Sequence, residues 1–157
     1  MDETQGANLA ILLLSGFESM VDEVVGELER HGHPGVRAVH EFAIRAIDGG
    51  ADTASELGRR LGVSKQAATK TIAALELLGY VVRSSDPLDS RRKRLIVTPR
   101  GYEMSTLGAR LFNAVRQRWA AEIGEKQLEA IESKLARVIR PRLFTTRKVD
   151  QAANDTA

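Results

Sequence analysis

Cysteine is absent from the 157 residues. Its absence excludes disulfide bonds, zinc sites built on thiolates, cysteine nucleophiles and thiol-based oxidant sensing. Long apolar runs are absent as well: the longest, from Leu9 to Leu14, has six residues, whereas a membrane-spanning helix needs about 20. The first residues are Met-Asp-Glu, where a secretory signal would carry positive charge. We therefore expect a cytoplasmic protein without a membrane partner.

Motifs of common catalytic chemistry are also missing. The sequence contains no G-x-G-x-x-G, no phosphate-binding P-loop and no G-x-S-x-G nucleophile turn. Its glycines stand at the ends of the expected helices instead. These observations predict a protein that is not an enzyme and that holds no cofactor.

Histidine is scarce, and its placement does not favour a metal site. The three histidines are His31, His33 and His40, with Glu29 and Glu41 nearby. His33 and Glu41 do not share a helical face, and His40 falls on an apolar stripe, which is typical of a hydrogen-bonded histidine near the core. We expect no bound metal.

The composition is that of a globular domain, with 43% hydrophobic and 28% charged residues. The net charge of +2 is unevenly distributed along the chain. Residues 1–52 carry −7, residues 53–101 carry +6 and the remainder carries +3. This asymmetry predicts that the middle third binds a polyanion while the first third contacts something else.

Helical periodicity flanks the basic third on both sides. Residues 7–31 form a wide apolar face that can contact both the core and a second subunit. A second helix is predicted from Pro34 to about Asp48. A long helix from Pro99 to about Ile123 and a last helix with a heptad-like apolar repeat follow the basic third.

Two short helices are predicted within the basic third. Thr53 and Glu56 have the spacing of a capping box, and the helix that they open ends at Gly62. Ser64 can cap a second helix, which runs to Leu78 before Gly79. Two short helices joined by a turn at glycine are typical of the helix-turn-helix motif.

The helix that starts at Ser64 has an apolar side and a basic side. Its predicted core side carries Ala68, Ile72 and Leu75. The opposite side carries polar or basic groups that suit bases and phosphates of a DNA major groove, namely Ser64, Lys65, Gln66, Thr69 and Lys70. An ordinary solvated helix face is the alternative.

A basic hairpin follows. Strand-forming residues 80–85 and 95–97 flank a turn-forming segment at 86–90, and Arg91, Arg92, Lys93 and Arg94 lie on the returning arm. A basic run is most often a solvated loop, but directly after a candidate recognition helix it favours a DNA-binding wing, because arginine suits a narrow minor groove. Asp89 would repel phosphates, so we predict that it organises the hairpin.

Three stretches resemble the winged helix-turn-helix of MarR-type transcriptional regulators: TASELGRRLGVSKQ at 53–66, LELLGYV at 75–81 and DPLDSRRKRLIVTPRG at 86–101. The Asp-x-Arg wing that ends in Leu-x-Val-Thr-x-x-Gly is the most specific part. Gly58 departs from the pattern, since alanine would be expected there.

The resemblance implies a mainly α fold with a small β wing, in which dimerisation helices flank the winged helix-turn-helix core. It implies a single MarR-like domain over residues 1–142. The dimerisation helices would be at about 7–32 and 102–140 and the DNA-binding lobe at about 34–101, with a flexible tail at 143–157.

The resemblance further implies a homodimeric repressor that binds a pseudo-palindromic operator in double-stranded DNA and is released by a small molecule. By position, Ser64, Lys65, Gln66, Thr69 and Lys70 fall on the recognition helix, and Asp89, Arg91, Arg92 and Lys93 fall on the wing. A phenolic or carboxylate effector would bind between the dimerisation helices and the DNA-binding lobe. Its candidate contacts, each equally well explained as core or surface residues, are Phe17, Arg37, His40 and Trp119.

Two alternatives remain at this point. The winged helix can serve as a protein-interaction module, or the protein can bind DNA without sensing a ligand. A protein-docking surface more often presents apolar residues, so the basic face favours DNA.

Overall fold

The computed structural model describes residues 4–139. The expected flexible tail at 143–157 and the expected domain end at residue 142 lie outside the described residues. The described chain contains α1 (Gln5–Arg30), α2 (Ala38–Asp48), α3 (Ala54–Leu61), α4 (Lys65–Leu77), β1 (Val81–Asp86), β2 (Asp89–Val97), α5 (Pro99–Ile123) and α6 (Glu125–Ile139). The predicted fold class, mainly α with one antiparallel hairpin, is confirmed.

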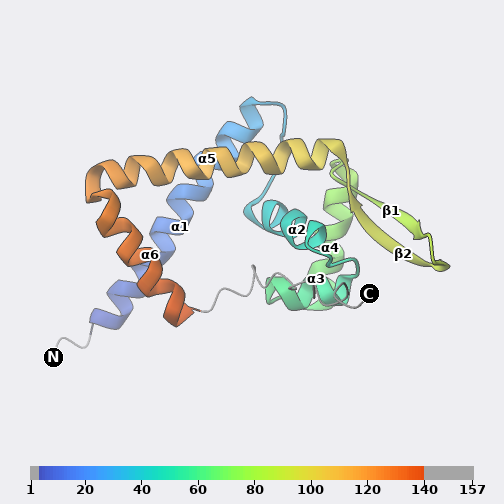
Figure 1. Ribbon diagram of the computed structural model, residues 1–157, viewed down its shortest axis with the longest axis horizontal. Helices are drawn as coiled ribbons and strands as arrows, with labels where there is room; N and C mark the ends of the chain where they lie inside the picture. The colour runs from blue at the N-terminus through green and yellow to red at the C-terminus, as the bar shows by residue number, and fades with distance from the viewer. Residues whose placement is uncertain (1–3, 140–157) are drawn as a thin grey trace, which may run out of the picture.

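Helix α5 runs along the length of the molecule (Figure 1). The hairpin lies at one of its ends, and at the other end the chain turns back into α6. Helix α1 packs on α5 and is joined to it by an ion pair between Arg118 and Glu23, 2.5 Å apart. Arg116 joins α5 to α6 through Glu125 and Glu132, at 2.8 and 2.7 Å. The hairpin and the first turns of α1 therefore lie at opposite ends (Figure 1).

The core lies where α2, α3, α4, the hairpin and the second half of α1 meet α5. Its largest fully buried side chains are Leu28, Ile44, Leu57, Ile72, Leu75, Tyr80 and Met104. The first half of α1 and the end of α6 differ, because large apolar side chains there are exposed in the single chain. They include Leu9, Ile11, Leu12, Leu13, Leu14, Ile131, Val138 and Ile139.

The predicted ends of the helix-turn-helix are confirmed. The Thr53 hydroxyl accepts a hydrogen bond from the Glu56 amide at 3.2 Å, and the Ser64 hydroxyl accepts one from the Ala67 amide at 3.1 Å. Gly62 ends α3 in the left-handed conformation, with φ at 69°. These local bonds position α4 after a tight turn.

Gly58 is where α3 approaches that turn most closely. A Cβ atom at this position would lie 3.0 Å from the Val63 carbonyl oxygen and 3.2 Å from that of Ser64. Close packing therefore accounts for glycine at a helical position where alanine has the higher propensity.

The predicted start of the second helix is wrong. The helix begins at Ala38, and Pro34 lies in a loop formed by residues 31–37. Gly32 and Gly35 in this loop have φ values of 87° and 75°. A right-handed helix cannot include such residues, so the chain turns here before α2 starts.

The hairpin is longer than predicted. Strand β2 begins at Asp89, not near Leu95, and only Pro87 and Leu88 stand between the strands. Cross-strand pairing continues to Ser85 and Lys93. The turn-forming residues at 86–90 therefore close a two-residue connection, and the whole basic run from Arg91 to Arg94 belongs to a strand.

Glu56 has a different partner from the one expected. Its carboxylate was predicted to bind the Thr53 amide, but it binds Arg59 at 2.7 Å and Arg60 at 3.0 Å. Hydrogen bonds from these two guanidinium groups, Arg59 first, lower the pKa of Glu56 to about 2. Arg60 is buried and also donates to the Gly49 carbonyl at 2.8 Å, which joins α3 to the end of α2.

Tyr80 connects three parts of the fold, and we call this group of residues the Tyr80 junction. Its hydroxyl lies 3.1 Å from His33 Nδ1 in the loop after α1, and the Arg100 guanidinium lies 5.3 Å from the centre of its ring. Its carbonyl accepts a hydrogen bond from the Thr98 amide at 2.9 Å, next to Gly101. Burial, and then the charge of Arg100, lower the pKa of His33.

We expect Gly101→Ala to destabilise the protein. The new Cβ would lie 2.3 Å from the Tyr80 carbonyl oxygen and 2.8 Å from Val97 Cγ1, so α5 or the base of the hairpin must move. Such overpacking costs roughly 1–3 kcal/mol, which exceeds the gain of about 1 kcal/mol from helix propensity. Thermal unfolding measures the change.

Gly26→Ala is the matched control, because a Cβ there meets no atom within 4 Å. This variant is expected to be at least as stable as the wild type. A Gly101→Ala protein with an unchanged or higher melting temperature would contradict the close contact at the Tyr80 junction.

Candidate DNA-binding surface and ligand pocket

The two sides of α4 differ as predicted. Ala68, Ile72 and Leu75 are buried, which fixes the rotation of the helix. The polar side chains on the other side are exposed, and we call this set the outward face of α4: Ser64, Lys65, Gln66, Thr69 and Lys70. The face begins at a capped helix N-terminus, where backbone N–H groups and the helix dipole favour phosphate.

Lys65 and Lys70 have no acidic partner in the described part of the chain. Among the basic side chains of the preceding helix, Arg59 and Arg60 share the carboxylate of Glu56. The Thr69 hydroxyl donates to the Lys65 carbonyl at 2.9 Å, so its methyl group is the part available for a base. The outward face of α4 thus carries two uncompensated cations beside an amide side chain.

Asp86 organises the turn of the hairpin, a role that the sequence analysis did not assign to it. It is buried, one carboxylate oxygen accepts from the Leu88 amide at 2.9 Å, and the other lies 3.0 Å from Arg94 Nε. Asp89 is exposed and accepts a hydrogen bond from the Arg91 amide at 3.0 Å, which is a contact within the hairpin. The two aspartates differ in burial, and no local sequence pattern distinguishes them.

Most basic side chains of the returning strand have a partner in the described chain, and Arg91 does not. Arg92 lies 3.2 Å from Asp52, and Arg94 lies 3.6 Å from the same residue. Lys93 donates to the Ser85 hydroxyl at 3.3 Å. The Arg91 guanidinium has no such contact among residues 4–139. Asp52, in the loop between α2 and α3, therefore ties the hairpin to the helical core through Arg92 and Arg94.

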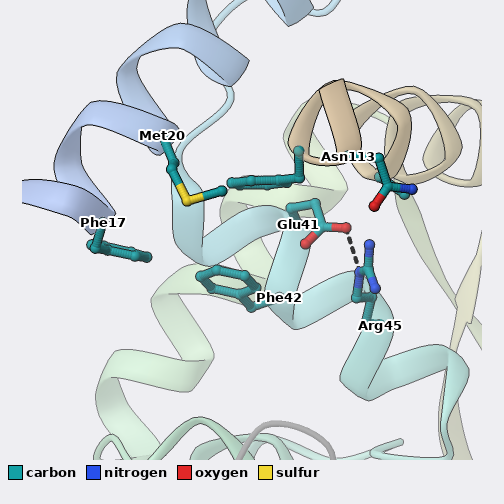
Figure 2. A pocket seen from close by; sticks show the side chains of 8 residues that line it. Phe17, Met20, Glu41, Phe42, Arg45 and Asn113 are labelled. Carbon is teal, nitrogen blue, oxygen red and sulfur yellow. Dashed lines mark hydrogen bonds and ion pairs between the residues drawn. The ribbon is translucent and has the colours of Figure 1, made fainter. Parts of the chain in front are cut away.

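An apolar pocket lies between α1, α2 and α5 (Figure 2). It has a volume of about 410 Å³ and is lined by Phe17, Met20, Glu41, Phe42, Arg45, Ala109, Phe112 and Asn113. The rings of Phe17 and Phe42 are stacked, with centroids 6.3 Å apart. The volume and the aromatic lining suit a small organic molecule.

Glu41 is the charged group of this pocket that burial affects most. Its side chain is 3% exposed, and Oε1 accepts from Arg45 Nε at 2.5 Å. Burial raises the pKa of Glu41, and the hydrogen bond and charge of Arg45 oppose that increase. Glu41 packs against α5 at Gly108, where a Cβ atom would lie 3.3 Å from Glu41 Cγ.

Only one of the four predicted ligand contacts lies at this pocket. Phe17 lines it. Arg37 is exposed and its amide donates to His40 Nδ1 at 3.1 Å, while His40 is buried and burial lowers its pKa. Trp119 packs over Gly16, 3.3 Å from the position of a Cβ atom there.

The polar lining of the pocket was missed because no sequence pattern distinguishes it. Glu41 and Arg45 have the spacing of an ordinary surface ion pair on a helix.

The sequence analysis considered Glu41 only as a metal ligand. Among residues 4–139 no three acidic or histidine side chains gather in a way that could hold a metal ion. The described residues also contain no helix with the length and apolarity to cross a membrane.

Comparison with known proteins identifies the sequence segment that carries the candidate DNA-binding surface. Residues 42–92 match the sequence profile of the MarR family. An uncharacterized HTH-type transcriptional regulator of Bacillus subtilis, YcgE, is 40% identical over 52 residues, which are 33% of this chain and 32% of the relative. The alignment thus spans about a third of the length of that curated relative.

Solved structures match nearly the whole chain. The alignment with a MarR family transcriptional regulator from Rhodococcus sp. RHA1 spans 89% of this chain and 98% of the regulator, with a TM-score of 0.68 and 18% identity. CouR from Rhodococcus jostii RHA1, bound to p-coumaroyl-CoA, covers 93% and 99%, with a TM-score of 0.66 and 18% identity. A MepR variant from S. aureus, bound to an oligodeoxyribonucleotide, covers 84% and 96%, with a TM-score of 0.55 and 16% identity. At these identities the likeness shows the fold.

The two aspartates of the hairpin are expected to differ on replacement. Asp86→Ala leaves the Leu88 amide and Arg94 without their buried acceptor, which costs about 1–3 kcal/mol, whereas Asp89→Ala removes one exposed bond. Hydrogen–deuterium exchange should therefore accelerate across the whole turn in Asp86→Ala and mainly at the Arg91 amide in Asp89→Ala. Equal acceleration in both variants would contradict the leading role of Asp86.

Proposed function

We propose, on the premise that the winged helix-turn-helix segment of this chain belongs to the MarR family, that the protein is a sequence-specific transcriptional regulator. It binds double-stranded DNA as a homodimer, represses from a pseudo-palindromic operator, and is released when a small molecule occupies the apolar pocket. The observation that carries the proposal is the outward face of α4, where Lys65, Gln66 and Lys70 are exposed without an acidic partner in the described chain beside the exposed basic hairpin.

The roles of the DNA-binding residues follow from their positions. Gln66 reads a base edge, since glutamine can pair with adenine through two hydrogen bonds. Ser64, Lys65 and Lys70 contact phosphates near the helix start, and the Thr69 methyl contacts a thymine methyl. Arg91 enters the minor groove beside the hairpin. Arg92 and Lys93 follow it, with Arg92 shared between Asp52 and phosphate.

The exposed apolar side chains of α1 and α6 support a dimer. They form an unpartnered surface at the end of the molecule opposite the hairpin, and surfaces of that kind mark protein interaction sites. A second copy is the fitting partner, because a pseudo-palindromic operator needs two recognition helices related by a two-fold axis, about 34 Å apart.

The pocket is placed to couple a ligand to DNA binding. Two of its walls, α1 and α5, belong to the helices assigned to dimerisation, and the third, α2, is joined to α3 through Arg60. A ligand that displaces α2 from α1 and α5 therefore changes the spacing of the two α4 helices. CouR, which has the same fold and is bound to p-coumaroyl-CoA, and the MepR variant, which is bound to an oligodeoxyribonucleotide, support both kinds of partner.

Selection of DNA fragments from a random duplex pool by the purified protein tests the DNA-binding function. We expect a pseudo-palindrome whose half-sites are about 10–10.5 base pairs apart, or a multiple of that distance. Gln66→Ala should relax discrimination at one position in each half-site, where a wrong base had cost about 1–3 kcal/mol. Lys70→Ala should weaken specific and random DNA alike and make the salt dependence shallower by about one unit per lost phosphate contact.

Lys126→Ala is the control for these variants, because it removes an exposed cation from α6, away from α4 and the hairpin. Its DNA binding is expected to match the wild type. A selected pool without a shared motif would overturn sequence-specific recognition, and equal effects of Gln66→Ala on specific and random DNA would overturn the role of Gln66.

Charged residues on the exposed apolar surface should separate the dimer. The double change Leu13→Glu with Val138→Glu places two carboxylates where apolar side chains are expected to meet, so sedimentation should give a folded monomer with much weaker operator binding. Leu77→Glu is the control for the sedimentation measurement, since Leu77 is exposed on α4 and lies outside α1 and α6. A wild-type protein that sediments as a monomer at micromolar concentration would contradict the dimer.

A further inference from the structure

One oxygen of the Glu41 carboxylate has no bonding partner in the described chain. Arg45 occupies Oε1, and no hydrogen bond to Oε2 is found among residues 4–139. Yet no fully enclosed side-chain oxygen or nitrogen of the described residues lacks a partner, so Oε2 keeps some accessible surface. Because Glu41 lines the pocket (Figure 2), we take that surface to face the pocket interior.

The two charged groups of the ion pair differ in exposure. Glu41 is 3% exposed and packs against α5 at Gly108, so its carboxylate lies on the inner side of the pocket. The Arg45 side chain is 39% exposed and carries its charge toward solvent. The pocket therefore contains a buried negative charge whose cationic partner lies nearer the solvent.

The electrostatic cost of burying Glu41 is only partly offset. Desolvation of a carboxylate disfavours its charged form, and the raised pKa of Glu41 has burial as its largest cause, with Arg45 opposing it. A second cation beside Oε2 would reduce this cost further. An anion would instead meet the buried carboxylate in surroundings of low polarity, where like charges repel strongly.

Apart from Asn113, the remaining lining residues are apolar, and three of them are aromatic. Phe17 and Phe42 are stacked at 26°, and Phe112 and Met20 line the same space (Figure 2). Aromatic faces attract flat apolar bodies and also cations placed over the ring. Shape and charge thus select for the same kind of molecule.

We infer that the pocket binds a flat aromatic molecule with one protonated amine, whose N–H donates to the free oxygen of Glu41 while the ring lies among Phe17, Phe42 and Phe112. This inference rests on the proposed function for its regulatory meaning, because the bound amine would be the effector. It differs from the phenolic or carboxylate effector that the family resemblance implied. A carboxylate would have only Arg45, which Glu41 already binds, and a neutral phenol would give the Glu41 carboxylate a weaker hydrogen bond than a protonated amine does.

Three probes of one shape test the ligand class: 2-(2-naphthyl)ethylamine, 2-(2-naphthyl)ethanol and 2-naphthylacetate. Calorimetric titration of the full chain near neutral pH should give binding of the amine about tenfold tighter than of the alcohol, because a charge-assisted hydrogen bond is about 1.4 kcal/mol stronger than a neutral one. The acetate should bind most weakly. This ranking is measured on the wild-type protein and needs no variant to fold.

Variants identify the group responsible. Glu41→Gln should remove the preference for the amine, whereas Arg45→Gln should strengthen amine binding, because the competing cation is gone. Glu29→Gln, which neutralises an exposed carboxylate on α1, is the matched control and should leave the ranking unchanged. Circular dichroism checks that each variant is folded.

The outcomes separate this inference from the proposed function. Tightest binding of the acetate, lost in Arg45→Gln, would overturn the inference, as would equal binding of all three probes. A protein that prefers the amine but binds no selected DNA fragment would support the pocket assignment and overturn the regulator. If the protein still binds its selected DNA fragment when the pocket is saturated with a tightly bound amine, the inferred ligand class stands, but the amine is not an effector of DNA binding.

Discussion

The fully buried side chain of Tyr80 is the contact on which both ends of the molecule depend. Its carbonyl accepts the Thr98 amide, its hydroxyl meets His33, and Gly101 lies directly against its backbone. These bonds fix the base of the hairpin to the first turn of α5 and to the loop after α1. Because α5 is a long uninterrupted helix, the direction set at the Tyr80 junction also determines where α6 lies relative to α4 (Figure 1).

Charge neutralisation within the chain separates structural cations from those available to a partner. Arg60 and Arg94 hold neighbouring elements together through Glu56, Gly49, Asp52 and Asp86. Lys65, Lys70 and Arg91 stay without such partners in the described chain. Binding a polyanion through the second group costs no existing contact, whereas binding through Arg92 must compete with Asp52. The basic third of the sequence thus contributes both to the fold and to the proposed DNA-binding surface.

The apolar pocket lies where α2 meets α1 and α5. Its charged pair, Glu41 and Arg45, belongs to α2, which also receives the Arg60 guanidinium at its C-terminal end. In the proposed function, this one short helix links occupancy of the pocket to the position of α4. A buried carboxylate at such a position is costly for stability alone, which is consistent with a role in binding.

The sequence by itself determined the ends of the two helices of the helix-turn-helix, the core side of α4 and the basic character of the hairpin, because caps, glycines and a 3.6-residue period act over a few neighbouring residues. It predicted the outward face from Ala68, Ile72 and Leu75 alone, and the resemblance added the family and fold. Only the tertiary structure revealed that Asp52 holds Arg92, that Asp86 rather than Asp89 is buried, and that Glu41 faces an apolar pocket. Each of these depends on contacts between elements far apart in the chain, and burial changes the energy of a carboxylate by an amount that no local pattern encodes.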